Sequence, residues 1–201
     1  MHISDGVLSA PVWIGSYVVT TAITAATSRK MNPENIPKVA VMTSVFFVAS
    51  LIHIPIGPTS VHLILNGLVG IILGPLAFVS ILLGLVLQAL LFQHGGITTI
   101  GANSLMMGLP ALLAYRIFNL HRRFRFKSKE AIFGGLAGAN GVLLGVFILA
   151  VLLVTTGEEF IGIAKFAALA HLPVILIEAV ISGFIVSFLY KVKPEILKGG
   201  V

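Results

Sequence analysis

The sequence predicts an all-α integral membrane protein built as a single bundle of seven transmembrane helices. The 201 residues are 57% hydrophobic and only 10% charged, whereas a soluble domain typically carries about 25% charged residues. No Asp, Glu, Lys or Arg occurs between Lys38 and Arg116. Since one spanning helix needs about 20 mostly apolar residues, this stretch must cross a bilayer several times. The apolar segments are too long and alternate too little for a β-barrel, which leaves helices.

Seven apolar segments follow one another, and prolines mark several of their edges, because proline fits the first turn of a helix but breaks its interior. The second segment follows Pro37, the third closes at Gly74-Pro75, and Pro173 is expected within the first turns of the seventh. Nothing indicates a second soluble domain, so residues 1–201 are expected to form one transmembrane domain. The segments cover about residues 11–27, 38–53, 60–73, 76–92, 99–118, 131–155 and 166–190.

The basic residues predict the orientation of this bundle. With seven helices, the loops after the first, third and fifth share one side with the C-terminal tail. Every Lys and Arg except Lys165 lies in or beside one of these loops or the tail. The positive-inside rule makes that side cytoplasmic, which puts the N-terminus outside and the C-terminus in the cytoplasm. Residues 1–10 lack the basic region and apolar core of a cleavable signal, so we expect Met1 to remain the N-terminus.

The histidines are distributed in the opposite way. Of the six, only His121 is predicted on the cytoplasmic side. The other five fall near the outer ends of helices, where ionisable groups in a membrane protein are candidates for function. With no cysteine in the chain, thiolate ligands are excluded. The pattern therefore indicates an external metal site built from nitrogen ligands, drawn from His2, His53, His62, His94 and His171.

The first two residues form a chelating unit if the α-amine is free. Met1 would supply the amine, and His2 would supply its backbone nitrogen and its imidazole Nδ1. The amide nitrogen binds only after losing its proton, which Cu(II) and Ni(II) achieve readily, Co(II) less readily and Zn(II) poorly. Three nearly coplanar nitrogens that await a fourth favour Ni(II) or Cu(II). Asp5 and Gly6 are suited to a tight turn that would fold this terminus back into the bundle.

Three stretches carry a resemblance to a known family: MHISDGVL (1–8), HIPIGPTSVHL (53–63) and QALLFQHGGITTIGANSLMMG (88–108). Together they resemble the CbiM/NikM family, the substrate-binding (S) components of energy-coupling-factor transporters for nickel and cobalt. The resemblance covers most of the chain in matching order. It implies a six-helix core plus an extra N-terminal helix whose start tucks into the bundle, so that residues 1–201 would be one substrate-binding domain.

The resemblance also implies the ligands. Met1 and His2 would be joined by a histidine from the region between the second and third helices. We favour His62, expected at the start of the third helix, with His53 as the alternative. Possible supporting residues around the ligands are His53, Asp5, Ser60, Gln93, His94 and Asn103. The HIPIGPTSVH stretch resembles nickel-associated members slightly more than cobalt ones.

Several other features favour structural roles. Met106 and Met107 are expected in the core, and Glu178 is expected to face the bundle and accept hydrogen bonds, near His171. Small residues spaced along two helices could dock a partner, but internal packing is the favoured interpretation. They are Gly134, Gly138, Gly141 and Gly145 on the sixth, and Ala22 and Ala26 on the first.

The function predicted is capture of Ni²⁺, or next Co²⁺, at the outer face of a bacterial or archaeal cell membrane, with no chemistry performed on the ion and no resident cofactor. The chain has no Walker motif, so ATP hydrolysis would fall to partners. The family implies a transmembrane coupling subunit and two ATP-binding-cassette ATPases, with a small accessory membrane subunit as a further candidate. An intramembrane metalloenzyme is the alternative, disfavoured because HExxH is absent. A channel or secondary carrier is disfavoured by the charge-free middle helices.

Overall fold

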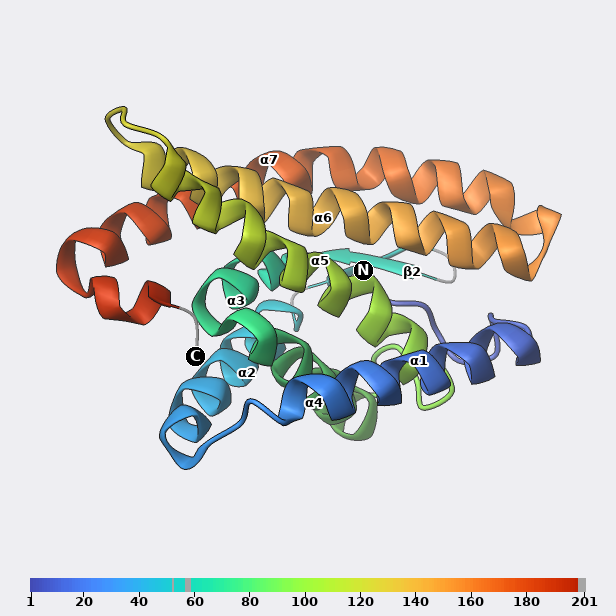
Figure 1. Cartoon of the computed structure of the whole chain (residues 1–201). Helices are drawn as coiled ribbons and strands as arrows, with labels where there is room; N and C mark the ends of the chain where they lie inside the picture. The colour runs from blue at the N-terminus through green and yellow to red at the C-terminus, as the bar shows by residue number, and fades with distance from the viewer. Residues whose placement is uncertain (52, 57–58, 199–201) are drawn as a thin grey trace.

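The computed structural model describes residues 1–51, 53–56 and 59–198, which form a helical bundle with one short β-hairpin (Figure 1). Apolar composition and proline at the first turn of α1 and α2 account for the helices. The α-helices are α1 (Ala10–Ser28), α2 (Ile36–Ala49), α3 (Asn66–Leu73), α4 (Ala77–Phe92), α5 (Ile100–Asn119), α6 (Lys129–Thr156) and α7 (Ile161–Val192). Short 3-10 turns are η1 (Pro33–Asn35), η2 (Gly74–Leu76), η3 (Leu120–Arg123), η4 (Glu158–Phe160) and η5 (Pro194–Lys198).

Each of the seven predicted segments overlaps one of these α-helices, but α3 and α4 are not separated by a loop. They are joined directly through η2, where Gly74 has φ +58°, so the seven α-helices of the described part form six continuous helical runs. Three runs in this part are long and apolar enough to cross a membrane: Asn66–Phe92, Lys129–Thr156 and Glu158–Val192. The all-helical membrane class is therefore confirmed. The division into a six-helix core and one extra helix stays a prediction.

The hairpin was not predicted, and it corrects two helix boundaries. Strands β1 (His53–Ile56) and β2 (Thr59–His62) pair antiparallel, with His53 opposite His62. Helix α2 ends at Ala49, not near residue 53 as predicted, and α3 begins at Asn66, not near residue 60. The physical reason is local: β-branched residues favour extended backbone, and Pro55 disfavours helical backbone both at its own position and before it. His62 consequently lies on a strand instead of a helix start.

Helices α6 and α7 run side by side as a long antiparallel pair (Figure 1). A Cβ at Gly138 would lie 2.5 Å from Ser182 Oγ, and one at Gly134 would lie 2.8 Å from Val186 Cβ. These glycines therefore let α7 approach α6 closely, which confirms that they serve internal packing. Pro173 lies well inside α7 and not in its first turns, contrary to the prediction.

The outward faces of α6 and α7 are apolar. Such side chains would be costly in water and suit a lipid environment. In the described part the most exposed of them include Leu143, Phe147, Leu169, Leu176, Val180 and Phe184.

The basic segments gather at one end of the molecule. Figure 1 shows the α1–α2 connection, the α5–α6 connection and the C-terminal part of the chain at one end, and the α6–α7 connection at the other. The first three carry most of the Lys and Arg residues, and the last contains Glu158 and Glu159. The basic segments that the sequence analysis assigned to one side of the membrane therefore do lie together at one end of the folded molecule.

The close contact of α3 with α5 generates a stability prediction. A Cβ at Gly70 would lie 2.0 Å from the backbone oxygen of Ala111, whereas one at Gly15 on α1 would meet nothing within 4 Å. We expect Gly70→Ala to destabilise the fold by about 1–3 kcal/mol, since overpacking against backbone forces the helices apart. The matched control Gly15→Ala should leave stability unchanged or raise it by up to about 1 kcal/mol. Thermal unfolding of the detergent-solubilised variants measures both, and an unchanged melting temperature for Gly70→Ala would contradict the packing.

Candidate metal centre

The N-terminal segment (residues 1–9) begins inside the bundle, where residues 1–3 are buried, and reaches the surface at residues 4–6 (Figure 1). Met1 and Ile3 are both 0% exposed. Asn103 on α5 holds Ile3 by two hydrogen bonds: the Ile3 N–H donates to Asn103 Oδ1 (2.9 Å), and Asn103 Nδ2 donates to the Ile3 carbonyl (3.1 Å). Thr99 Oγ1 donates to the same carbonyl at 2.8 Å. The buried N–H and carbonyl groups of Ile3 therefore both have hydrogen-bond partners, as burial of backbone polar groups requires.

Asp5 provides a second anchor, on the loop between α4 and α5. Its carboxylate accepts hydrogen bonds from the Ile97 N–H (3.1 Å) and from the Thr98 N–H (2.8 Å) and hydroxyl, while its own N–H donates to the Gly95 carbonyl (2.9 Å). A Cβ on Gly96 would lie 2.1 Å from the carboxylate carbon, so this approach needs glycine. Asp5 thus fixes the segment and the loop to each other and does not touch the histidine rings.

Gln88 on α4 determines which nitrogen of the His2 ring carries the proton. Ser50 Oγ donates to the Phe47 carbonyl (2.8 Å), so it must accept from Gln88 Nε2 (2.6 Å). That leaves Gln88 Oε1 facing His2 Nε2 at 2.7 Å, and an amide oxygen can only accept. In the neutral ring the proton is therefore on Nε2, and Nδ1 carries a free lone pair.

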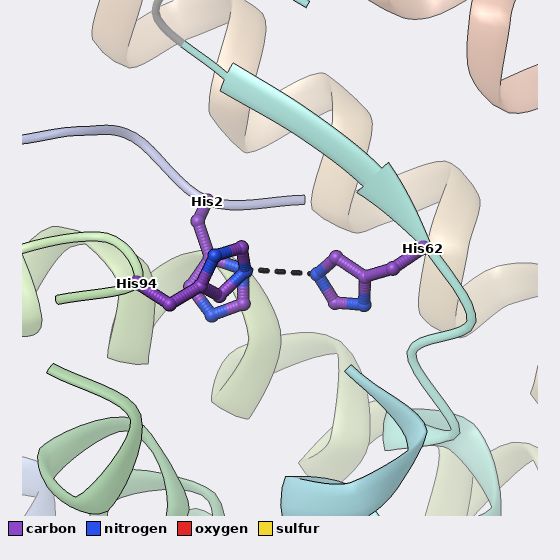
Figure 2. Close-up of side chains that lie close together, drawn as sticks. All are labelled: His2, His62 and His94. Carbon is purple, nitrogen blue, oxygen red and sulfur yellow. Dashed lines mark hydrogen bonds between the residues drawn. The ribbon is translucent and has the colours of Figure 1, made fainter. Parts of the chain in front are cut away.

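His62 is fixed in a complementary way. Its Nδ1–H donates to the Leu63 carbonyl at 2.7 Å, which leaves a lone pair on Nε2. This Nε2 lies 2.9 Å from His2 Nδ1, as the dashed line in Figure 2 shows. Two lone pairs at that distance repel each other unless a cation, either a proton or a metal ion, lies between or beside them. The two rings are thus arranged to share one cation.

His94 completes a cluster of three imidazoles (Figure 2). One nitrogen from each of His2, His62 and His94 lies within 4.8 Å of the others. The His94 ring is 4.0 Å from that of His2 at an angle of 62°, and its buried Nε2 has no hydrogen-bond partner in the described part. The sequence predicted only a supporting role for His94, but its ring lies where it could itself bind an ion held by His2 and His62.

Burial makes these groups good ligands. Desolvation lowers the pKa of the Met1 amine and of the His2 and His62 rings well below their ordinary values, and it lowers the pKa of His94 to about 4. Neutral nitrogen donors do not have to lose a proton before binding a metal. The nitrogens are therefore available at neutral pH.

The remaining predicted residues lie around this cluster with different roles. His53 is exposed, with its ring 4.2 Å from that of His94. Gln93 is exposed at the end of α4 with φ +53°. Ser60 lies on β2 opposite Pro55, and its side chain is outside the described residues. His171 lies buried on α7, where its Nδ1–H donates to the Ala167 carbonyl at 2.7 Å. Its Nε2 has no hydrogen-bond partner in the described part of the chain, so no bond joins it to Glu178.

Gln88 is the residue that sequence reasoning missed. A signal was present, since it is the only polar amide between Asn66 and Gln93 in an otherwise apolar run. It is fully buried. Its position opposite His2 depends on packing between α4 and a segment 86 residues away, which a reading along the chain does not provide.

Comparison with known proteins identifies the family. The family described as the cobalt uptake substrate-specific transmembrane region (CbiM) matches residues 2–196. The chain belongs to this family. It is 34% identical over 199 residues to a Haemophilus influenzae protein provisionally named a metal transport protein, covering 98% of this chain and 97% of that one. It is 32% identical over 224 residues to the cobalt transport protein CbiM of Clostridium tetani, covering 100% and 90%.

A solved structure agrees with this assignment. The crystal structure of a transition metal transporter superposes with a TM-score of 0.79 at 27% identity, covering 96% of this chain and 93% of that one. The fused nickel transport protein NikMN of Rhodobacter capsulatus is 32% identical over 160 residues, covering 75% of this chain and 46% of that one. This CbiM-family chain is therefore a multi-pass membrane component of cobalt or nickel uptake and not an enzyme.

Anchoring by Asn103 predicts how accessible the terminus is. In the wild type the buried Met1 amine should react slowly with a water-soluble amine-modifying reagent. Asn103→Ala removes both bonds to Ile3. We therefore expect the terminus to be released and modified at least about tenfold faster, since the loss of two buried hydrogen bonds weakens its anchoring. Asn119→Ala, which removes only a bond to Tyr115 on the same helix, is the control and should react like the wild type.

Mass spectrometry of the N-terminal peptide measures the rate of modification. Equal rates for the wild type and Asn103→Ala would contradict the described insertion of the N-terminal segment. The measurement needs no metal, so it tests the architecture of the centre separately from its ligand.

Proposed function

We propose that this CbiM-family protein captures Ni²⁺, and less preferentially Co²⁺, in a planar site made by the Met1 amine, the backbone nitrogen and Nδ1 of His2, and Nε2 of His62. The observation that supports it most is the 2.9 Å separation of His2 Nδ1 and His62 Nε2, both with free lone pairs. Metal–imidazole bonds are about 2.0–2.1 Å long. Two such nitrogens at a right angle lie about 2.8–3.0 Å apart, and at a tetrahedral angle about 3.3–3.4 Å, so the spacing fits square-planar coordination.

The N-terminal dipeptide would supply the other three nitrogen ligands of the planar site. Amine and amide close a five-membered ring with the ion, and amide and Nδ1 close a six-membered ring. Both chelates fix their donors near one plane, and Ni(II) can drive the loss of the amide proton that binding requires. Planar nitrogen coordination is typical of Ni(II) and Cu(II), which favours nickel over zinc. His94, whose ring is steeply inclined to that of His2, is then placed to approach one face of the plane.

We place the centre at the extracytoplasmic side of the cell membrane. The segments rich in Lys and Arg lie together at one end of the bundle (Figure 1), and the positive-inside rule makes that end cytoplasmic. The N-terminus and the histidine cluster then face outward, and the C-terminus lies in the cytoplasm.

Transport itself requires partners. The relative NikMN is a fusion, and this chain covers only 46% of it. A second fused relative, CbiMQ of Methanocorpusculum labreanum, is covered to 36%. These fusions support partner subunits for the present chain, which we propose to be a transmembrane coupling subunit and two ATPases, with a small accessory membrane subunit as a further candidate.

The amine is tested by acetylation of the N-terminus. Acetylating Met1 turns the amine into an amide and introduces no new amine, so it should abolish stoichiometric Ni²⁺ binding, together with the d–d absorption of planar Ni(II). Elemental analysis of nickel and cobalt in the purified protein measures the loss, and circular dichroism verifies the fold. Unchanged binding by the acetylated protein would contradict amine ligation and leave a site made of imidazoles alone.

The choice of fourth ligand is tested by a matched pair of variants on the two strands. His62→Ala should weaken Ni²⁺ binding by at least about 100-fold, since it removes a ligand. His53→Ala should weaken it by less than about tenfold, since the exposed His53 ring lies against His94 and its Nδ1 lies 3.3 Å from the Leu51 carbonyl. Competition against a chelator of known affinity measures both. The reverse order would assign the fourth position to His53.

A further inference from the structure

A buried carboxylate on α7 holds the linker between β2 and α3. Glu178 is 0% exposed, and its Oε1 accepts hydrogen bonds from the N–H groups of Ile64 (2.5 Å) and Leu65 (2.8 Å). Leu65 has φ +56°, an unfavourable conformation for a residue with a side chain. Charge-assisted bonds to two successive N–H groups stabilise that conformation.

The same linker orients His62. The Leu63 carbonyl, which accepts from His62 Nδ1–H, and the Ile64 N–H, which donates to Glu178, belong to one peptide group. Glu178 therefore fixes the peptide plane that fixes the imidazole. It also polarises that peptide, which strengthens the bond to Nδ1–H and raises the electron density at Nε2, as carboxylates hydrogen-bonded to metal-bound histidines do directly.

The other carboxylate oxygen has no such partner. Glu178 Oε2 is buried without a hydrogen bond in the described part of the chain, so without a metal ion either protonation state leaves a polar group unpaired there. The carboxyl group bonds the N–H groups of the second and third residues after His62, so it lies beside the proposed fourth ligand. Among the described side chains, Glu178 is the only Asp, Glu, Lys or Arg that is buried.

The charge of the loaded site gives this carboxylate a second role. A divalent ion bound to one deprotonated amide and three neutral nitrogens carries a net single positive charge. An uncompensated charge is costly in a buried, apolar surrounding. One nearby carboxylate makes the loaded centre neutral overall.

We propose that Glu178 is the positioning residue and counter-charge of the metal centre, coupling α7 to His62 through the Leu63–Ile64 peptide. This inference rests on the proposed nickel site. It makes α7 the helix whose displacement would loosen the fourth ligand, although no atom of α7 is itself proposed to bind the ion.

Two variants separate geometry from charge. Glu178→Gln keeps an oxygen that can accept both N–H bonds but removes the charge, and Glu178→Leu removes both. Ser182→Ala is the matched control, since Ser182 is buried on α7, one turn further along, with an unpaired hydroxyl. The readouts are Ni²⁺ affinity by chelator competition, the d–d spectrum of the bound Ni(II), and the melting temperature without metal.

We expect Glu178→Gln to bind Ni²⁺ about 10–100-fold more weakly with the planar spectrum kept, the range found for residues that support metal ligands. Glu178→Leu should lose the planar spectrum, and Ser182→Ala should match the wild type in affinity and spectrum. Should Glu178→Leu fail to fold, Glu178→Gln still decides the counter-charge role.

Wild-type affinity and spectrum in Glu178→Gln would overturn the counter-charge role, and a retained planar spectrum in Glu178→Leu would overturn the positioning role. An equal loss in Ser182→Ala would assign the effect to α7 packing and overturn both. Failure of the wild type to bind Ni²⁺ would instead overturn the proposed function, so the two failures are distinguishable.

Discussion

The insertion of the chain's first three residues into the bundle is the constraint on which the rest of the site depends. An amine, an imidazole and several peptide groups are placed where water is excluded. Each of them destabilises the fold unless it has a hydrogen-bond partner or binds an ion. Asn103 and Thr99 satisfy the backbone of Ile3, and Asp5 ties the segment to the next loop. Gly145 leaves room for the end of the Met1 side chain, since a Cβ there would lie 2.5 Å from Met1 Cε.

Once the segment is inserted, hydrogen bonds to α4 and to the linker between β2 and α3 decide which nitrogens are free. Gln88 Oε1 on α4 accepts from His2 Nε2–H, and the Leu63 carbonyl accepts from His62 Nδ1–H. Each bond uses the nitrogen that faces away from the other ring, so both remaining lone pairs point at one place. Second ring nitrogens bound in this way are the usual means of orienting metal ligands. The preference for a metal ion thus comes from residues that never touch it.

Much of this could be predicted from the sequence, and the exceptions have physical causes. The apolar segments located every helix, because length and hydropathy are local properties, and the free Met-His terminus is readable as a chelate. The β-hairpin was missed because two prolines in HIPIGPTSVH look like helix boundaries, while strand pairing depends on register between 53–56 and 59–62. Gln88 and the ligand-like placement of His94 were missed because both depend on where α4 ends relative to the inserted terminus. Asp5 was expected to serve its own turn, but its partners lie more than 90 residues further along the chain.

The most direct test of the central claim is X-ray absorption at the nickel edge of the Ni²⁺-loaded protein with its native terminus. A planar site built on the inserted terminus should give the pre-edge feature of square-planar Ni(II), with four nitrogen scatterers in the first shell and the multiple scattering of imidazole. A six-coordinate spectrum with oxygen scatterers and no such pre-edge feature would contradict this site, because the buried terminus would then not supply the planar nitrogen donors.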